Sequence, residues 1–163
     1  MIGGLEGARV LDLYAGSGAV GLEALSRGAA DAVLIESDPG AAQAIRSNIG
    51  AIGLPGARLV QDKVGRALRR GPGSAGPRDF VFADPPYATT DDELTQVLMT
   101  LADAGWLAAG ALVVVERDAR SGSPRWPAAY AEDRSRKYGE TVLWYGRASG
   151  AAPPPKRRER DSA

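Results

Sequence analysis

Two residue types are missing from this sequence, and each absence excludes a class of chemistry. None of its 163 residues is a cysteine, so it offers neither a disulfide nor a thiol nucleophile. None is a histidine, which excludes histidine-based triads, histidine metal sites and the commonest general base of enzymes. Any chemistry here must therefore use carboxylates, backbone groups or a reactive cofactor.

The sequence also lacks a long hydrophobic run. No apolar stretch is long enough to cross a membrane, and the first residues do not have the charged-then-apolar pattern of a secretion signal. Basic and acidic residues balance at 20 each, and the length suits one domain. We therefore expect a cytoplasmic protein without membrane contact.

The most informative motif is Asp84-Pro85-Pro86-Tyr87, which follows an apolar run at residues 80–83. Two consecutive prolines fix the backbone at the end of a strand and supply no N–H donor. The carboxylate and the nearby carbonyls can only accept hydrogen bonds. A rigid set of acceptors beside an aromatic ring suits a planar group with an amino substituent, such as a nucleobase edge. The alternative is a plain turn after a strand.

A second motif has the order of a nucleotide-binding unit. An apolar strand at residues 10–14 is followed by a glycine-containing turn at 15–18, a helix at 19–27 and a strand at 32–35 that ends in Glu36. Glycines let the backbone pass close to a ligand, and the next helix points free N–H groups toward it. An acid twenty positions after Gly16 can meet ribose hydroxyls. The unit indicates a cofactor that contains adenosine.

Strand and helix patterns alternate along the chain, which predicts an α/β fold: a mostly parallel sheet with helices on both faces. We expect further strands at residues 57–61, 79–83 and 111–116, and further helices at 39–52, 64–70 and 91–104. The strands at 130–138 and 141–145 are typical of an antiparallel hairpin. Acids follow or end four strands, at the sheet edge where such folds bind ligands: Asp12, Glu36, Asp62 and Asp84.

Residues 148–163 differ in composition from the rest. They contain small residues and prolines, then four basic side chains against two acidic ones. This composition predicts a disordered, proline-rich basic tail after a domain at residues 1–147. The tail is either a solubilising end or an electrostatic contact for RNA phosphates.

Residues 12–29, the step Glu36-Ser37-Asp38, the Asp84–Tyr87 motif and the strand 113–116 together resemble the class I S-adenosylmethionine-dependent methyltransferases. More narrowly, they resemble a bacterial family that methylates guanine N2 in 16S ribosomal RNA, the type D methyltransferases of the small ribosomal subunit. The resemblance implies a three-layer Rossmann-like fold with a seven-stranded sheet and an antiparallel last strand. It also implies a monomer that methylates guanine N2 in 16S rRNA or the assembled small ribosomal subunit.

The resemblance assigns the cofactor, S-adenosylmethionine, to one set of residues: Asp12, Tyr14, Ala15, Gly16, Ser17, Gly18, Glu36, Ser37 and Asp62. Asp12 and the turn would hold the methionine part, and Glu36 the ribose hydroxyls. Ser37 would lie along the adenine, and Asp62 would meet the adenine amino group. No metal is implied.

The resemblance also assigns a catalytic set, Asp84, Pro85 and Tyr87. The Asp84 carboxylate and the Pro85 carbonyl would accept hydrogen bonds from the guanine amino group, while Tyr87 stacks on a base taken out of its helix. The cofactor supplies an activated methyl group, so the enzyme needs in-line positioning rather than a strong base.

One implied element is missing from the sequence. The resemblance implies a basic hairpin and a helix before the first strand, which dock RNA and cover the cofactor. Here Met1 lies a few residues before the predicted strand at 10–14. We expect the cofactor-binding core, and a truncated, non-catalytic module that binds S-adenosylmethionine or RNA stays open as an alternative.

Two other enzyme classes stay open. An adenine-N6 nucleic-acid methyltransferase shares the Asp84–Tyr87 motif, but such enzymes usually carry a target-recognition region, for which 163 residues leave no room. A nicotinamide-dependent oxidoreductase would fit the glycine turn and Glu36, but it leaves the Asp84–Tyr87 motif unexplained. Binding of S-adenosylmethionine or of NAD separates the cofactor classes.

Overall fold

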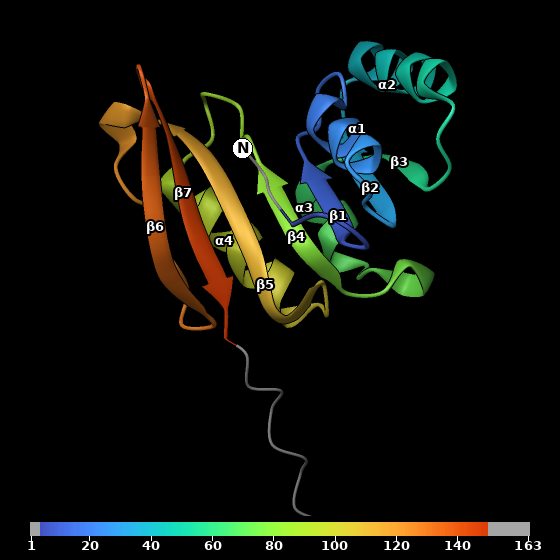
Figure 1. Cartoon of the computed structure of the whole chain (residues 1–163). Helices are drawn as coiled ribbons and strands as arrows, with labels where there is room; N and C mark the ends of the chain where they lie inside the picture. The colour runs from blue at the N-terminus through green and yellow to red at the C-terminus, as the bar shows by residue number, and fades with distance from the viewer. Residues whose placement is uncertain (1–3, 150–163) are drawn as a thin grey trace, which may run out of the picture.

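The computed structural model describes residues 4–149, which form a seven-stranded sheet in the order β3-β2-β1-β4-β5-β7-β6 (Figure 1). The strands from β1 to β5 run parallel, and β7 is antiparallel to both of its neighbours. The predicted fold is therefore confirmed, including the antiparallel hairpin. The strands are β1 (Arg9–Leu13), β2 (Asp31–Glu36), β3 (Ala57–Gln61), β4 (Arg78–Ala83), β5 (Leu107–Asp118), β6 (Tyr130–Tyr138) and β7 (Thr141–Ala148).

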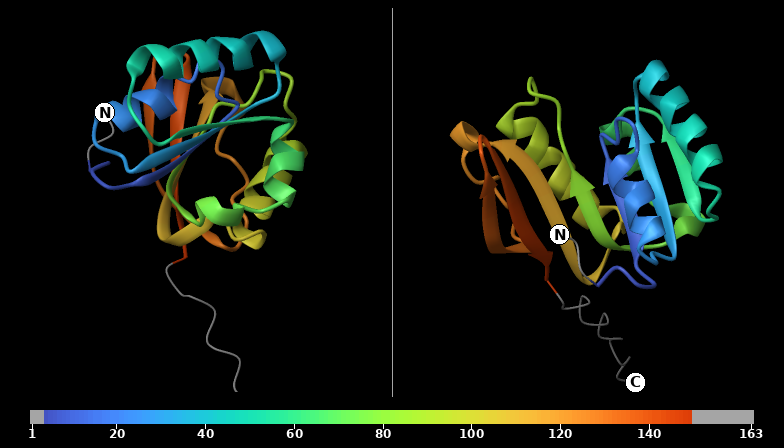
Figure 2. Two further views of the ribbon diagram at one scale, coloured as in Figure 1. Left: turned by 90° about the vertical axis from the view of Figure 1, so that its right-hand side faces the viewer. Right: turned by 45° about the horizontal axis from the view of Figure 1, so that its top comes forward.

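Helices cover both faces of the sheet, as two further views show (Figure 2). The helices are α1 (Ala19–Ser26), α2 (Pro39–Ile52), α3 (Val64–Arg69) and α4 (Asp91–Asp103), with two single 3₁₀ turns at Gly73–Ala75 and Ala119–Ser121. The first two pack in one hydrophobic core, and α3 and α4 pack in another on the opposite face. None of the helices in residues 4–149 has both the length and the apolar content to span a bilayer.

The central strands are apolar on both faces because each face is covered. In β1, Leu11 and Leu13 pack toward α3 and α4, while Val10 packs toward α1. In β2, Leu34 faces α1 and Ile35 faces the other core. Strands buried on both sides have continuous hydrophobic sequences, which is why β1 and β2 lack the polar alternation of a half-exposed strand.

Local signals explain where two of the helices begin. Asp38 caps α2, with its carboxylate accepting from the Ala41 N–H at 2.8 Å, and Pro39 occupies the first helical position. Thr90 and Glu93 form a capping box at the start of α4, each side chain accepting from the other's backbone N–H at 3.1 Å. The capping box fixes the start of α4 next to the end of β4.

Two ion pairs link strands at the end of the sheet where the parallel strands begin. The fully buried Arg78 of β4 pairs with Asp31 of β2, and Arg9 of β1 pairs with Asp79 at 3.3 Å. These pairs join the three strands at their amino ends. The carboxyl ends of the same strands carry the acids that the sequence singled out.

Two boundaries differ from the sequence-based expectation by more than two residues. β5 begins at Leu107 rather than 111, and its register against β4 shifts between Arg78 and Phe80. β7 continues to Ala148, which is buried, because Arg147 still pairs with Leu112 of β5. Residue 148 therefore belongs to the sheet, and residues 150–163 of the predicted tail lie outside the described part of the chain.

Candidate functional site

A cavity of about 800 Å³ opens at the carboxyl ends of the parallel strands. The order of the strands reverses between β1 and β4 at this place, which is where α/β sheets bind ligands. Four of the predicted site residues line the cavity: Tyr14, Glu36, Ser37 and Asp84. The ends of β1, β2 and β4 thus bring together residues that are up to seventy positions apart in the sequence.

The glycine turn between β1 and α1 is fixed by its backbone conformation. Tyr14 has φ 56°, and no other non-glycine residue in 4–149 adopts a positive φ. Gly16 and Gly18 have φ 59° and 81°. A Cβ at Gly18 would meet Leu34 at 3.0 Å, so this glycine allows α1 to pack on β2, whereas Gly16 has open space around it. The open position is the one where a ligand can approach the backbone.

Neighbouring segments hold this turn in place. The Ala15 N–H donates to the carbonyl of Ile35 at 3.0 Å, and the Asn48 side chain donates to the carbonyl of Ser17 at 2.9 Å. The predicted turn residues are therefore anchored to β2 and α2.

Glu36 clamps the same turn through both oxygens of its carboxylate. One oxygen accepts from the Gly16 N–H and the other from the Asp38 N–H, each at 2.8 Å. A carboxylate has about four acceptor positions, so two are left for hydroxyl groups. Glu36 thus lines the cavity and can still accept hydrogen bonds from a ligand inside it.

Asp12 lies beneath the turn and does not line the cavity. Its side chain is buried, and it accepts from the Gly21 N–H at 2.9 Å. Gly18 precedes α1 and has no capping side chain, so Asp12 supplies that helix with an acceptor from β1. Burial raises the pKa of Asp12 to about 7, and the charges of Asp84 and Glu36 add to this effect.

Asp62 also lies outside the cavity wall. Its carboxylate accepts from Arg70 at 2.6 Å and pairs with Arg66 at 3.6 Å, and the Arg70 hydrogen bond is the main reason that its pKa is lowered. Arg66 and Arg69 of α3 line the cavity instead. The sequence did not single out these arginines, because a short basic helix has the same pattern on any solvated surface.

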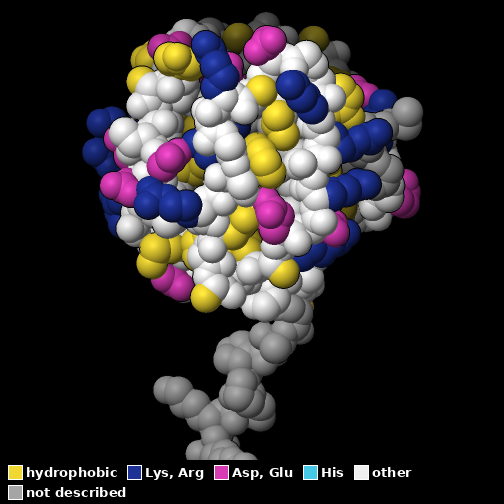
Figure 3. Space-filling model, turned by 90° about the vertical axis from the view of Figure 1, so that its left-hand side faces the viewer, with side chains coloured by type: hydrophobic (Ala, Val, Ile, Leu, Met, Phe, Trp, Pro, Cys, Tyr) yellow, Lys and Arg dark blue, Asp and Glu magenta, His cyan; other side chains and the backbone are white. Residues whose placement is uncertain are grey.

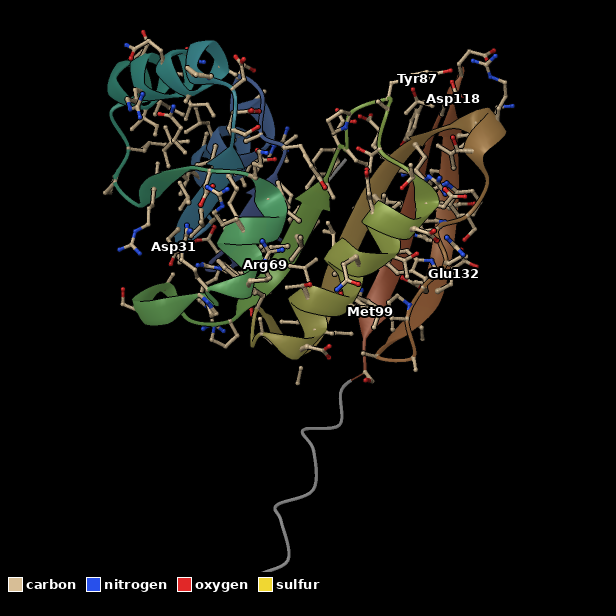
Figure 4. The ribbon with its side chains drawn as sticks, turned by 180° about the vertical axis from the view of Figure 1, so that it is seen from behind. Asp31, Arg69, Tyr87, Met99, Asp118 and Glu132 are labelled. Carbon is tan, nitrogen blue, oxygen red and sulfur yellow. The ribbon has the colours of Figure 1, made fainter. Side chains whose placement is uncertain are left out.

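The Asp84–Tyr87 motif separates two cavities. Asp84 and Pro86 line the main cavity, while Pro85, Pro86 and Tyr87 line a second one of about 300 Å³. The Tyr87 side chain is 92% exposed and lies at the tip of the loop after β4, near Asp118 (Figure 4). Because the ring is not packed on its own loop, its face is free to contact a ligand.

Two further acids at the site were not predicted. Glu93 of α4 lines the main cavity, and together with burial it raises the pKa of Tyr14 to about 12. Glu116 ends the apolar part of β5, and the pairing of Ala83 with Val115 sets it beside Asp84. The two carboxyl groups share a hydrogen bond, and burial, this bond and the charge of Asp84 raise the pKa of Glu116 to about 7. An acid after three valines was the sequence signal for Glu116.

Among the described residues, the acidic side chains of the site are hydrogen-bond acceptors rather than a metal-binding group. Within the part of the chain that the structure describes, no group of three acidic side chains is arranged to hold a metal ion. The carboxyl groups of Asp12, Glu36, Asp84 and Glu116 instead gather around the ends of β1, β2, β4 and β5, while Arg66 and Arg69 of α3 line the main cavity. These carboxyl groups favour a ligand that carries hydrogen-bond donors.

Comparison with known proteins identifies the family of this site. The model of the family described as conserved hypothetical protein 95 matches residues 1–147. The chain belongs to this family. The predicted resemblance to the type D methyltransferases of the small ribosomal subunit is confirmed by the relatives of the chain.

One such relative is "Ribosomal RNA small subunit methyltransferase D" of Escherichia coli strain K12, 38% identical over 135 residues. The match covers 83% of this chain and 66% of the relative, so the chain spans just under two thirds of that protein. "Putative rRNA methyltransferase YlbH" of Bacillus subtilis is 34% identical over 142 residues, which cover 83% of this chain and 73% of the relative.

A solved structure agrees with the fold of this member of the family. The Escherichia coli protein named "Putative methyltransferase yhhF" superposes with a TM-score of 0.80 and 36% sequence identity. The superposition covers 89% of this chain and 79% of that one. The Rossmann-like methyltransferase architecture expected from the sequence is therefore confirmed.

Proposed function

We propose that this chain binds S-adenosylmethionine and transfers its methyl group to the exocyclic N2 of a guanine in the RNA of the small ribosomal subunit. The observation that carries the proposal is the cavity of about 800 Å³ at the switch point of the sheet, walled by Glu36 and Asp84. Its acceptors complement the ribose hydroxyls and amino groups of the cofactor, and the carboxylates of Glu36 and Asp84 complement its sulfonium charge. The proposal includes action as a cytoplasmic monomer on 16S rRNA or the assembled subunit.

The residues at the cavity fit this cofactor. Glu36 has two free acceptor positions for the ribose hydroxyls, and Ser37 lies beside it on the cavity wall. The open backbone at Gly16 allows the methionine part to approach the turn, which Asp12 supports from below. When bound, the cofactor supplies a methyl group that is already activated for transfer. Asp62 reaches the adenine amino group only by sharing its carboxylate with Arg70.

The loop after β4 would bind the base. Asp84 and the Pro85 carbonyl accept the two hydrogens of the guanine amino group, which turns the nitrogen lone pair toward the methyl donor. Tyr87 would stack on the extruded base, returning part of the stacking energy lost on extrusion. Its exposed ring is available for that contact.

Glu36→Ala should weaken the binding of S-adenosylmethionine by about 30- to 150-fold, the equivalent of about 2–3 kcal/mol for lost charge-assisted hydrogen bonds. Calorimetric titration measures this affinity, and a parallel titration with NAD tests the nicotinamide-dependent alternative. Glu36→Gln keeps one acceptor oxygen and should lose less affinity. Glu23→Ala removes an exposed glutamate of α1 and serves as the matched control. Unchanged affinity in a folded Glu36→Ala variant would remove Glu36 from the site.

Tyr87→Ala should lower the rate of single-turnover methylation by about ten- to a hundredfold, because base–aromatic contacts contribute about 1–3 kcal/mol. Tyr87→Phe keeps the ring face and should be nearly neutral. Both variants should melt at the wild-type temperature, since the side chain is 92% exposed. A drop in melting temperature with an unchanged rate would assign the ring to packing.

Analysis of the methylated nucleoside tests the base specificity. Digestion of the RNA and mass spectrometry should give N2-methylguanosine. A product methylated at adenine N6 would favour the adenine-specific alternative. Cofactor binding without any methylated product from 16S rRNA or small ribosomal subunits would favour the non-catalytic module.

A further inference from the structure

Two cavities meet at the end of β4, and a pair of carboxyl groups lies between them. Asp84 lines the main cavity of about 800 Å³, and Glu116 lines the second cavity of about 300 Å³. Pro86 and Thr89 line both. Because the register of β4 and β5 sets Asp84 beside Glu116, their carboxyl groups form a polar connection between the two cavities.

A hydrogen bond between two carboxyl groups requires a proton, since two carboxylates can only accept. A proton on Glu116 can therefore bridge the two carboxyl groups. The parallel register of β4 and β5 enforces their proximity: Ala83 pairs with Val115, and the acids follow directly in each strand. The raised pKa of Glu116, about 7, agrees with a proton that is retained near neutral pH.

We propose that Asp84 and Glu116 form a proton relay, which carries the proton released by methyl transfer from the main cavity to the second cavity. The relay rests on the proposed function, because that reaction supplies the proton. It gives Glu116 a role in proton release that neither the sequence motif nor the cofactor assignment contains. It also explains why the second cavity adjoins the Asp84–Tyr87 motif.

Bond changes and proton movements balance in this relay. The amino nitrogen forms a bond to the methyl carbon, while the carbon–sulfur bond of the sulfonium methyl donor breaks and leaves its electron pair on sulfur. The nitrogen then carries one surplus proton, which passes to Asp84. The proton that the pair already shares moves fully onto Glu116, and Glu116 releases it to water in the second cavity. The pair again shares one proton, and one proton has entered the solvent.

The surroundings of Glu116 suit proton release. Leu143 of β7 is its apolar partner in the sheet, and Leu94 of α4 lines the same cavity. Arg117 is paired with Asp91 of α4, and Arg120 with Asp118 at 3.0 Å. These arginines therefore already have carboxylate partners. The ionisable groups around the second cavity are Asp84, Tyr87, Asp91, Arg117, Asp118 and Arg120.

The test compares Glu116→Gln with the wild-type chain and with Asp103→Asn, an exposed carboxylate at the far end of α4. Glutamine keeps the shape of the side chain but cannot carry a proton onward. We expect the single-turnover methylation rate to fall by about a hundredfold, the lower range for lost proton-transfer catalysis. The affinity for S-adenosylmethionine should stay within twofold of wild type. The melting temperature should stay within a few degrees of wild type. Asp103→Asn should match wild type throughout.

Infrared titration of the protein without cofactor gives a second, independent measurement. The wild type and Asp103→Asn should show a protonated carboxyl band that disappears as the pH passes about 7, and Glu116→Gln should lack this component. The band of Asp12, which titrates in the same range, should persist in all three proteins.

Different experimental results would contradict the relay and the proposed function. A Glu116→Gln variant that methylates at the wild-type rate, or that keeps every titrating band, would overturn the relay alone. A wild-type chain that does not bind S-adenosylmethionine would overturn the proposed function, and the relay with it, whatever the infrared titration shows.

Discussion

Replacement of Asp84 by alanine should lower methyl transfer by about a hundredfold or more while the affinity for S-adenosylmethionine stays within a few-fold of wild type. Under the proposed function, Asp84 accepts from the guanine amino group, and a hydrogen bond to a charged group contributes about 1.5–3 kcal/mol. The change also removes the first member of the pair with Glu116, so positioning and proton release are lost together. Incorporation of tritiated methyl groups into 16S rRNA or small ribosomal subunits measures the rate.

Two further variants make the Asp84 experiment decisive. Asp84→Asn should retain a little activity, because an amide oxygen still accepts one hydrogen bond. Asp79→Asn changes an acid at the opposite end of β4, where it pairs with Arg9, and should methylate normally. If Asp84→Ala incorporates methyl groups at the wild-type rate, both the proposed base contact and the relay are wrong.

Asp12→Asn should make the protein more stable at pH 8, by up to about 4 kcal/mol in the free energy of unfolding. Burial raises the pKa of Asp12 from 3.8 to about 7, a difference of about three units at 1.36 kcal/mol each. The folded state therefore binds this proton more tightly than the unfolded state does. Its stabilising contribution is complete below pH 4 and is lost as the pH rises toward 7.

The variant isolates this charge because asparagine keeps an oxygen that can accept from the Gly21 N–H. We expect the difference in unfolding free energy between Asp12→Asn and wild type to grow by about 2–3 kcal/mol from pH 5 to pH 8. Urea denaturation at several pH values measures it. The exposed Asp103→Asn should follow wild type at every pH. Parallel curves for Asp12→Asn and wild type would show that the buried charge carries no such cost.

The sequence predicted those parts of the molecule that depend on short-range signals. Asp38 and Pro39 marked the start of α2, and the spacing from Gly16 to Glu36 indicated that the two lie at one site, where a hydrogen bond joins them. Apolar runs located the strands, since a strand covered on both faces has few polar positions. The family resemblance supplied the number of strands and the antiparallel last strand, and the structure confirms both.

Contacts between side chains of different helices, strands and loops could not be predicted from the sequence. Nothing near Asp62 indicates that Arg70, eight positions later, takes its carboxylate. The burial of Asp12 and its bond to the Gly21 N–H likewise depend on the packing of α1 against β1. The contact of Asp84 with Glu116 depends on the register between β4 and β5, which a shift near Phe80 determines. Register follows from packing across the whole sheet, so the second acid became visible only in three dimensions.

The placement of β7 between β5 and β6 leaves β6 at one of the two edges of the sheet. A free edge exposes unpaired backbone groups on which a strand of another molecule can align. All residues of β6 after Tyr130 are exposed, and five of them carry charge. On the face that Figure 3 shows, basic and acidic side chains are interspersed. An approaching strand would have to strip water from these charges, so the order of the hairpin strands protects this edge from pairing with another molecule.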